Sequence, residues 1–347
     1  MCVSRLLKLT RARWRAILVS GILATILAAC GVVLWAGSEI ASPPRRSLMG
    51  YHREFLSNPA GHGVRLDRFT TGDGTPCLIC SPDSAGVLDK RGHIIRQQLS
   101  ARGLALPPAG KITGTLVLCH GRKGRKEDYL PIAERLCAVG FRCIIPDLPA
   151  HGEHPAAIAT YGIRETELPA RVLDEASRKF AFEKQPVGLL GMSMGGSVAV
   201  HAAGLADAPW RALVVISSFD SFPAAIVGQA SLHAGPLLGP PWADATAFVY
   251  QQKSGIVLNA IQPRRHAGSI QIPTLIAHGT NDRVIPIASG RRLFESLPAA
   301  TLKHWQEIPG ADHDNVLVTA YPIYADIAEW MIRHVTANHP AFVVPKK

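Results

Sequence analysis

Residues 187–196 read VGLLGMSMGG, an apolar run followed by a serine set between glycines. The run is typical of a buried strand, and the small residues after Ser193 are typical of a helix that begins at once. In such a strand–turn–helix the chain turns so sharply that flanking positions accept little more than hydrogen as a side chain. Gly191 and Gly195 meet that need. We therefore expect Ser193 to stand at the N-terminus of a helix, positioned as a nucleophile.

A serine nucleophile needs a histidine to take its proton and a carboxylate to orient that histidine. Residues 278–286 (HGTNDRVIP) follow one downstream apolar run and supply Asp282. Residues 308–315 (IPGADHDN) follow the next and supply His313. Loops that follow parallel strands meet at one edge of a sheet, so the sequence predicts a catalytic triad of Ser193, Asp282 and His313.

Apolar runs rich in β-branched residues alternate with longer amphipathic stretches along most of the chain. This alternation indicates an α/β protein with a mostly parallel sheet flanked by helices. We predict eight strands, at residues 64–70, 76–80, 114–119, 141–146, 187–190, 212–217, 273–277 and 303–308. The main helices are expected at residues 129–139, 165–183, 197–205, 288–297 and 321–335.

Two segments interrupt the alternation. Residues 83–111 have a charged middle and look like an insertion between neighbouring strands. Residues 221–269 are apolar and punctuated by glycine and proline, and they separate two predicted strands. An excursion at that point of the chain is expected to form a cap over the carboxyl edge of the sheet, where α/β proteins bind ligands.

These motifs resemble those of the α/β-hydrolase family, and the resemblance covers about residues 60–337. The loop at 279–286 is similar to the family's acid-bearing Gly-x-x-Asp-x-x-Val-Pro motif, with Ile285 as one additional residue before the proline. The resemblance implies an α/β-hydrolase fold and a serine hydrolase of the dienelactone-hydrolase-like, monoglyceride-lipase-like or prolyl-oligopeptidase-like group. Some relatives place the acid after the sixth strand, which makes Asp220 the alternative carboxylate.

The resemblance also assigns the donors of an oxyanion hole, which stabilises the tetrahedral intermediate of acyl transfer. One donor is the backbone N–H of Met194, directly after the nucleophile. The other is the backbone N–H of Arg122, in the loop after the third strand. His120 and Gly121 in the same loop are implied to contact the substrate.

A turn at residues 147–152 (DLPAHG) is similar to the family's Asp-x-x-Gly-His-Gly turn, from which Pro149 and Ala150 depart. In relatives this loop shapes the substrate pocket. His151 is therefore expected either to support the loop or to contact the substrate. His151 and His154 have no companion ligand cluster in the sequence, so we expect no metal site, and no motif indicates a cofactor.

Residues 122–126 (RKGRK) place four cationic side chains beside the predicted oxyanion hole. The loop either attracts an anionic substrate or lipid phosphate, or simply faces water as most charge runs do. The formal net charge of the chain is +11. Five of these charges lie in residues 1–15, and only +5 remains from Ser47 onward. That remainder is ordinary for a domain of this size, so we do not expect a nucleic-acid partner.

Residues 16–36 contain no charged side chain and are long enough to cross a bilayer as a helix. Basic residues precede this run, and none follows it for eight positions. The positive-inside bias predicts a basic cytoplasmic segment at 1–15, a transmembrane signal anchor at 16–37, and an extracytoplasmic chain beyond them. A linker is expected at 38–60 and the catalytic domain at 61–347.

Two processing routes compete with a retained anchor. Residues 27–30 (LAAC) resemble a bacterial lipobox, in which the chain is cut before Cys30 and that cysteine is lipidated. Plain cleavage near Ala36 is the other route. The apolar run continues to Trp35, past the point where either signal usually ends, which favours a retained anchor. Cys77 and Cys80 have C-x-x-C spacing but lie in an apolar run, so we expect structural thiols.

The sequence thus predicts a membrane-anchored serine hydrolase that cleaves carboxylic esters of a small-molecule or lipid-like acyl substrate. A peptidase or amidase on the same triad is the enzymatic alternative. A catalytically silent, membrane-bound binding protein is the alternative from another class, since fold does not imply function.

Overall fold

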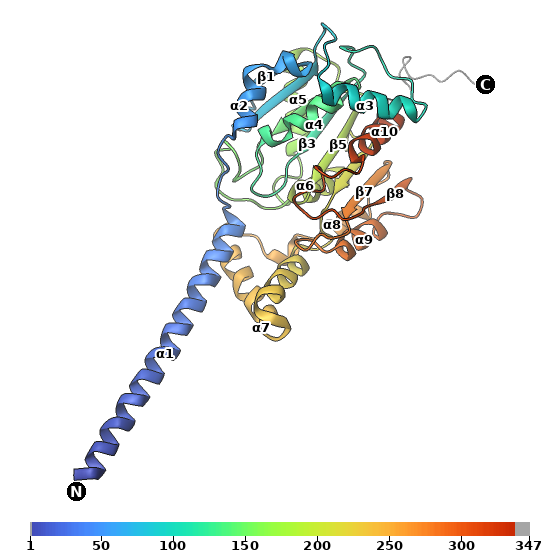
Figure 1. The fold of residues 1–347 in the computed structure, drawn as a ribbon. Helices are drawn as coiled ribbons and strands as arrows, with labels where there is room; N and C mark the ends of the chain where they lie inside the picture. Colours follow the sequence, from blue (N-terminus) through green and yellow to red (C-terminus); the bar gives the residue numbers. More distant parts are fainter. Residues whose placement is uncertain (1, 337–347) are drawn as a thin grey trace.

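The computed structural model describes residues 2–336 of the chain. Residues 337–347, at the end of the predicted catalytic domain, lie outside the described residues. Two parts are evident in Figure 1: an α/β body, and a long N-terminal helix that projects away from it.

The body is built on a sheet of eight strands in the order β1-β2-β4-β3-β5-β6-β7-β8. β2 runs antiparallel to both of its neighbours, and the strands from β4 to β8 are parallel to one another. The strands are β1 (Val64–Thr70), β2 (Pro76–Pro82), β3 (Gly114–Cys119), β4 (Phe141–Pro146), β5 (Val187–Met192), β6 (Leu213–Ile216), β7 (Thr274–Gly279) and β8 (Lys303–Ile308). All eight predicted strands are present, within a few residues at their ends.

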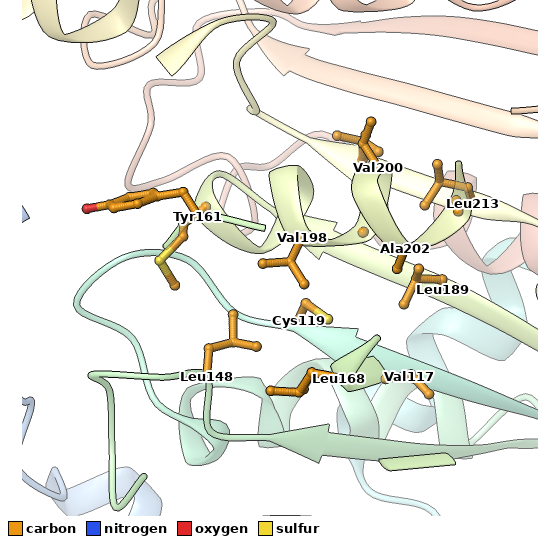
Figure 2. Packing of buried hydrophobic residues seen from close by; sticks show 14 of the residues in the cluster. Val117, Cys119, Leu148, Tyr161, Leu168, Leu189, Val198, Val200, Ala202 and Leu213 are labelled. Atoms are coloured by element: carbon orange, nitrogen blue, oxygen red, sulfur yellow. The ribbon is translucent and has the colours of Figure 1, made fainter. Parts of the chain in front are cut away.

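Helices cover both faces of the sheet, because successive apolar residues of each central strand point to opposite sides. On one face, Val117 and Leu189 belong to a core cluster with residues of α5 and α6, such as Leu168 and Val198 (Figure 2). Residues of α8 and α9 complete this cluster. On the other, Leu116 and Leu190 pack against α3, α4 and α10. The bounds are α3 (Lys90–Ala101), α4 (Leu130–Cys137), α5 (Leu168–Phe180), α6 (Met194–Ala203), α8 (Pro263–Ala267), α9 (Ile287–Glu295) and α10 (Ile323–Val335), with the 3-10 turn η2 at Lys126–Tyr129.

Two segments outside the predicted strands and helices contain helices. The insertion at 83–111 includes α3, whose first turn is capped by Asp89 through a 2.8 Å hydrogen bond from Gly92 N–H. Ile95 and Leu99 on its inner face are buried. The segment expected as a linker, 38–60, holds the last turn of the N-terminal helix, α2 (Gly50–Ser57) and the start of η1 (Pro59–His62).

The N-terminal helix α1 spans Cys2–Ala41. Its segment Arg13–Ala41 is long and apolar enough to cross a membrane. The predicted cap is helical as well, formed by α7 (Phe222–Ser254), η3 (Leu258–Ala260) and α8. α7 folds into two arms because Gly235 adopts a left-handed φ of 80°, and it packs against the end of α1 (Figure 1).

Candidate active site

Ser193 lies in the sharp turn between β5 and α6, where it forms the N-cap of the helix. Its backbone has φ 53° and ψ −117°, a strained conformation for a residue with a side chain. A Cβ at Gly191 would overlap the carbonyl oxygen of Gly195, and a Cβ at Gly195 would overlap that of Cys119. The two glycines are therefore required by close backbone approaches on both sides of the serine, as the sequence pattern predicted.

The side chains of Ser193, His313 and Asp282 form a continuous hydrogen-bonded chain. The Ser193 hydroxyl lies 3.0 Å from His313 Nε2 and can donate its proton to that nitrogen. His313 Nδ1–H donates to Asp282 Oδ2 at 2.7 Å. Each residue comes from a loop after a different strand, β5, β8 and β7 respectively. This arrangement matches the nucleophile, base and orienting acid expected of acyl transfer.

Asp282 is held as a carboxylate by its surroundings. Its Oδ1 accepts hydrogen bonds from the backbone N–H groups of Val284 at 3.0 Å and Ile285 at 2.8 Å. Burial alone would raise the pKa of Asp282, but hydrogen bonds from His278, His313 and Ile285 outweigh burial and hold that pKa well below its ordinary value. The charge is thus available to keep the His313 ring in the Nδ1–H tautomer.

Asp220, the alternative acid, is engaged elsewhere. Its buried carboxylate accepts two hydrogen bonds from the guanidinium of Arg292, at 2.9 and 3.0 Å, and another from the Ser289 hydroxyl. These contacts join the end of β6 to helix α9. The geometry therefore favours Asp282 over Asp220 as the residue that orients His313.

The two residues expected to supply oxyanion donors, Met194 and Arg122, lie in the turn after Ser193 and in the loop after β3. Met194 is the first residue of α6, where the helix leaves N–H groups without an intrahelical partner. Gly121 approaches the serine so closely that a Cβ there would lie 3.5 Å from Ser193 Cβ. Arg122 follows Gly121 directly, and the turn is closed by a 3.1 Å hydrogen bond from Gly124 N–H to Gly121 O.

His120 supports this loop from inside the protein. The ring is fully buried, donates from Nδ1 to Gly121 O at 2.8 Å, and accepts at Nε2 from Leu148 N–H at 3.0 Å. Burial lowers the pKa of His120, so the ring stays neutral. These contacts fix the loop after β3 to the loop after β4, which is a positioning role rather than the substrate contact implied by family resemblance.

His151 lies beside His120, with ring centroids 5.3 Å apart. Its Nδ1–H donates to Pro149 O at 2.8 Å, and the ring is buried. Burial and the neighbouring His120 lower the pKa of His151 to about 3. The His154 ring is likewise engaged, by Ala156 N–H at 3.0 Å and Thr75 Oγ1 at 3.3 Å. Both histidines thus serve to fold the loop after β4.

The cationic loop at 122–126 is neutralised by carboxylates of the same chain. Arg122 and Lys123 contact Glu39 in the last turn of α1, at 3.0 and 2.6 Å. Lys126 is buried and contacts the carboxylates of Asp147 at 2.7 Å and Glu153 at 2.6 Å. Arg125 contacts Glu127 at 2.6 Å. The structure therefore favours a structural role for this loop over attraction of an anionic substrate.

One further cluster has the donor atoms of a metal site. The side chains of His62, Asp89 and Glu134 approach within 4.8 Å of one another. Both oxygens of Glu134 already have partners in the protein, Arg91 at 3.2 Å and His62 Nδ1 at 3.4 Å. Cys77 and Cys80 are free and buried in β2, and burial raises the pKa of both thiols, which fits structural cysteines.

The sequence motifs did not predict three contacts around the site. His278 donates from Nε2 to Ile285 O at 2.8 Å and lies 3.4 Å from the Asp282 carboxylate. The Ser218 hydroxyl donates to Ser193 O at 2.8 Å. Glu39 reaches the oxyanion loop from α1. His278 lies between a predicted strand and the acid-bearing motif that begins at Gly279, a position that could have indicated it, whereas the other two residues carry no local signal.

Comparison with known proteins gives the same fold. The model of the "Alpha/beta hydrolase family" matches residues 116–325. A pimeloyl-[acyl-carrier protein] methyl ester esterase of Chromobacterium violaceum is 27% identical over 234 residues, 57% of this chain and 86% of that one. Protein YqkD of Bacillus subtilis, which is uncharacterized, is 26% identical over 192 residues, 52% of this chain and 59% of that one.

Among solved structures, an esterase of Pyrococcus furiosus, Pf2001, superposes with a TM-score of 0.58 at 16% sequence identity. The match covers 85% of this chain and 98% of the esterase, and it establishes similarity of fold. The family model spans more than half of the chain, including the sharp turn at Ser193 and the loops that carry Asp282 and His313. The chain therefore belongs to the alpha/beta hydrolase family.

Proposed function

We propose that this protein is a membrane-anchored serine hydrolase that cleaves carboxylic esters through an acyl-enzyme. The observation that carries the proposal is the hydrogen-bonded chain from Ser193 through His313 to Asp282. These hydrogen bonds join a strained serine at a helix N-terminus to a histidine and a buried carboxylate. Relatives named as esterases support an ester as the substrate.

In the acylation half-reaction, Ser193 Oγ attacks the carbonyl carbon while its proton moves to His313 Nε2. The negative charge that develops on the carbonyl oxygen is stabilised by the backbone N–H groups of Met194 and Arg122. Each such donor lowers the barrier by about 3 kcal/mol in well-studied hydrolases. As the tetrahedral intermediate collapses, His313 returns the proton to the leaving alkoxide and an alcohol departs.

Deacylation repeats these steps with water as the nucleophile. His313 takes a proton from the water as its oxygen attacks the ester carbonyl of the acyl-enzyme. Collapse of the second intermediate breaks the bond to Ser193, which recovers the proton from His313. The products are one carboxylic acid and one alcohol for each ester and water consumed. Asp282 stays ionised throughout and stabilises the imidazolium that forms in each half-reaction.

The membrane anchor is supported by helix α1 and by the charges around it. The segment Arg13–Ala41 forms one continuous helix, and most of its apolar side chains as far as Trp35 are exposed. The basic residues before the apolar run place the N-terminus in the cytoplasm by the positive-inside bias. The catalytic domain then lies on the extracytoplasmic side, held close to the membrane surface by α1.

The substrate class can be tested with membranes that contain the wild-type protein or the Ser193→Ala variant. The panel comprises p-nitrophenyl esters of increasing acyl length and the matching aminoacyl p-nitroanilides. We expect serine-dependent cleavage of esters and little cleavage of anilides. Cleavage of anilides without esters would replace the esterase with the amidase alternative. Equal rates for the variant and the wild type would contradict catalysis by Ser193.

A further inference from the structure

The cap helix α7 has an unusual composition for a surface element. Residues 222–243 contain no Asp, Glu, Lys or Arg, although the two arms stand clear of the sheet (Figure 1). Near the turn between the arms, the side chains of Leu232, Leu237 and Leu238 are 65%, 88% and 63% exposed. Large exposed apolar patches of this kind mark contact surfaces, for protein or for lipid.

The second arm of α7 packs closely against α1. A Cβ at Gly37 would lie 2.6 Å from Val249 Cβ and 2.9 Å from Thr246 O, so only glycine allows this approach. Ala29 and Val33 continue the same face of α1, since they precede Gly37 at intervals of four residues. Both are partly covered, whereas Val32 is 46% exposed. Because α7 packs against α1 and Ala29 and Val33 are partly covered, we infer that α7 runs beside that helix toward Ala29.

This packing fixes the depth of α7 relative to the proposed anchor. About 20 helical residues cross a hydrocarbon core of roughly 30 Å, so the uncharged run at 16–36 fills the core. Ala29 and Val33 belong to the second half of that run, which is the extracytoplasmic half when the N-terminus is cytoplasmic. An element that lies beside them must share their depth in the bilayer.

We propose that the two-armed helix α7 is immersed in the extracytoplasmic leaflet beside α1 and binds the acyl chains of membrane lipid. This inference rests on the membrane anchor of the proposed function. The exposed leucines near Gly235 then contact lipid rather than water, which accounts for both their exposure and the absence of charge. Burial of these side chains in hydrocarbon favours membrane binding.

Two further features fit a lipid-facing α7. A hollow of about 330 Å³ lies between its arms, lined mainly by apolar residues that include Ile226, Ala247 and Phe248. The apolar part of this lining suits an acyl chain, and Asp244, Gln251 and Asn259 are its polar members. The first arm also reaches the acid-bearing loop, because Gln229 Nε2 donates to Arg283 O at 2.9 Å and Val284 O at 2.8 Å. The lipid-facing element is thus joined directly to the loop that holds Asp282.

Photo-crosslinking of the full-length protein in phosphatidylcholine–phosphatidylglycerol nanodiscs tests the proposal. The photoreactive residue p-benzoylphenylalanine is placed at Leu237 in α7, at Val32 in α1, or at Leu302. Leu302 is a matched control, because it is an exposed leucine directly before β8. It lies at the amino end of that strand, whereas the site lies at the carboxyl ends of the strands. Lipid adducts are measured by intact-protein mass spectrometry after irradiation.

We expect lipid adducts at Leu237 and Val32, with at least a tenfold lower yield at Leu302. Adducts at Val32 without adducts at Leu237 would overturn the immersion of α7 and leave the anchor in place. An absence of adducts at both positions would overturn the membrane anchor itself, and the inference with it. Equal yields at Leu237 and Leu302 would show non-specific contact with lipid and would also overturn the inference.

Discussion

The carboxylate of Glu39, in the last turn of α1, lies 3.0 Å from the guanidinium of Arg122, in the loop that borders Ser193. The neighbouring carbonyl groups reinforce this connection: Ile40 O accepts from the Tyr161 hydroxyl at 2.8 Å. Ala41 O accepts from Ala159 N–H, also at 2.8 Å. The residues that leave the proposed membrane segment are therefore bound to the edge of the catalytic site rather than forming a free linker.

Replacing Glu39 by Gln should lower kcat/KM about fivefold for a p-nitrophenyl ester. A partly exposed ion pair contributes about 1 kcal/mol, and its loss relaxes the loop that presents the Arg122 N–H to the oxyanion. The effect should fall on kcat rather than on KM. Glu54→Gln removes a more exposed carboxylate, which contacts His62 rather than the loop at 122–126, and serves as the control. An unchanged kcat in Glu39→Gln would show that the end of α1 does not contribute to catalysis.

Replacing Asp282 by Asn should reduce kcat by about 10⁴-fold while the protein stays folded, because the amide no longer selects the reactive tautomer of His313. Steady-state ester hydrolysis measures this loss. The control is Asp314→Asn, which alters an exposed carboxylate adjacent to His313 in the sequence. A loss of less than tenfold in Asp282→Asn would argue against its assignment as the orienting acid.

Replacing Asp220 by Asn should destabilise the protein but leave its kcat nearly unchanged. The change breaks the pairing with Arg292, and we expect the free energy of unfolding to fall by about 1–3 kcal/mol. The kcat of the folded fraction should stay within a factor of three of wild type. Thermal unfolding and active-site titration measure the two quantities. A collapse of kcat like that of Asp282→Asn would make Asp220 the catalytic acid.

The Glu134 carboxyl should make stability depend on pH. Burial and the adjacent Asp89 carboxylate raise the pKa of Glu134 to about 8, above its ordinary value of 4.5. The folded state therefore binds the extra proton, and stability from this group falls as the pH rises from about 4.5 to 8. Glu134→Gln should remove this dependence. The free energy of unfolding of the variant minus that of wild type should be at least about 1 kcal/mol larger at pH 8.5 than at pH 5. Denaturant unfolding at both pH values measures this difference, and equal differences at the two values would contradict the raised pKa.

The strands and the sharp turn at Ser193 could be predicted because local sequence patterns determine them. Strands such as β3 and β5 are apolar runs buried on both faces, and such runs stand out in any sequence. Likewise, Gly191 and Gly195 are dictated by close backbone approaches within one turn. The order of serine, acid and histidine along the chain then placed Asp282 and His313 in loops at one edge of the sheet, where the structure brings them together.

Other elements could not be predicted, because contacts distant in sequence decide them. Helix α3 lies in a charged segment whose few apolar residues, Ile95 and Leu99, become informative only when the neighbouring helices are in place. Helix α7 contains four prolines, which argue against one continuous helix in the sequence. Pro236 begins the second arm, where the helix needs no N–H donor. The pairing of Glu39 with Arg122 joins residues more than eighty positions apart, and no local pattern encodes it.

The central claim is that Ser193 is the nucleophile, and labelling with a fluorophosphonate probe tests it most directly. Membranes that contain the full-length protein are treated with the probe, and the labelled peptide is identified by mass spectrometry. We predict one label on Ser193, formed at a rate that falls by more than a hundredfold in His313→Ala and is zero in Ser193→Ala. Labelling of Ser193→Ala to the wild-type extent, or no labelling of the folded wild-type protein, would contradict the account.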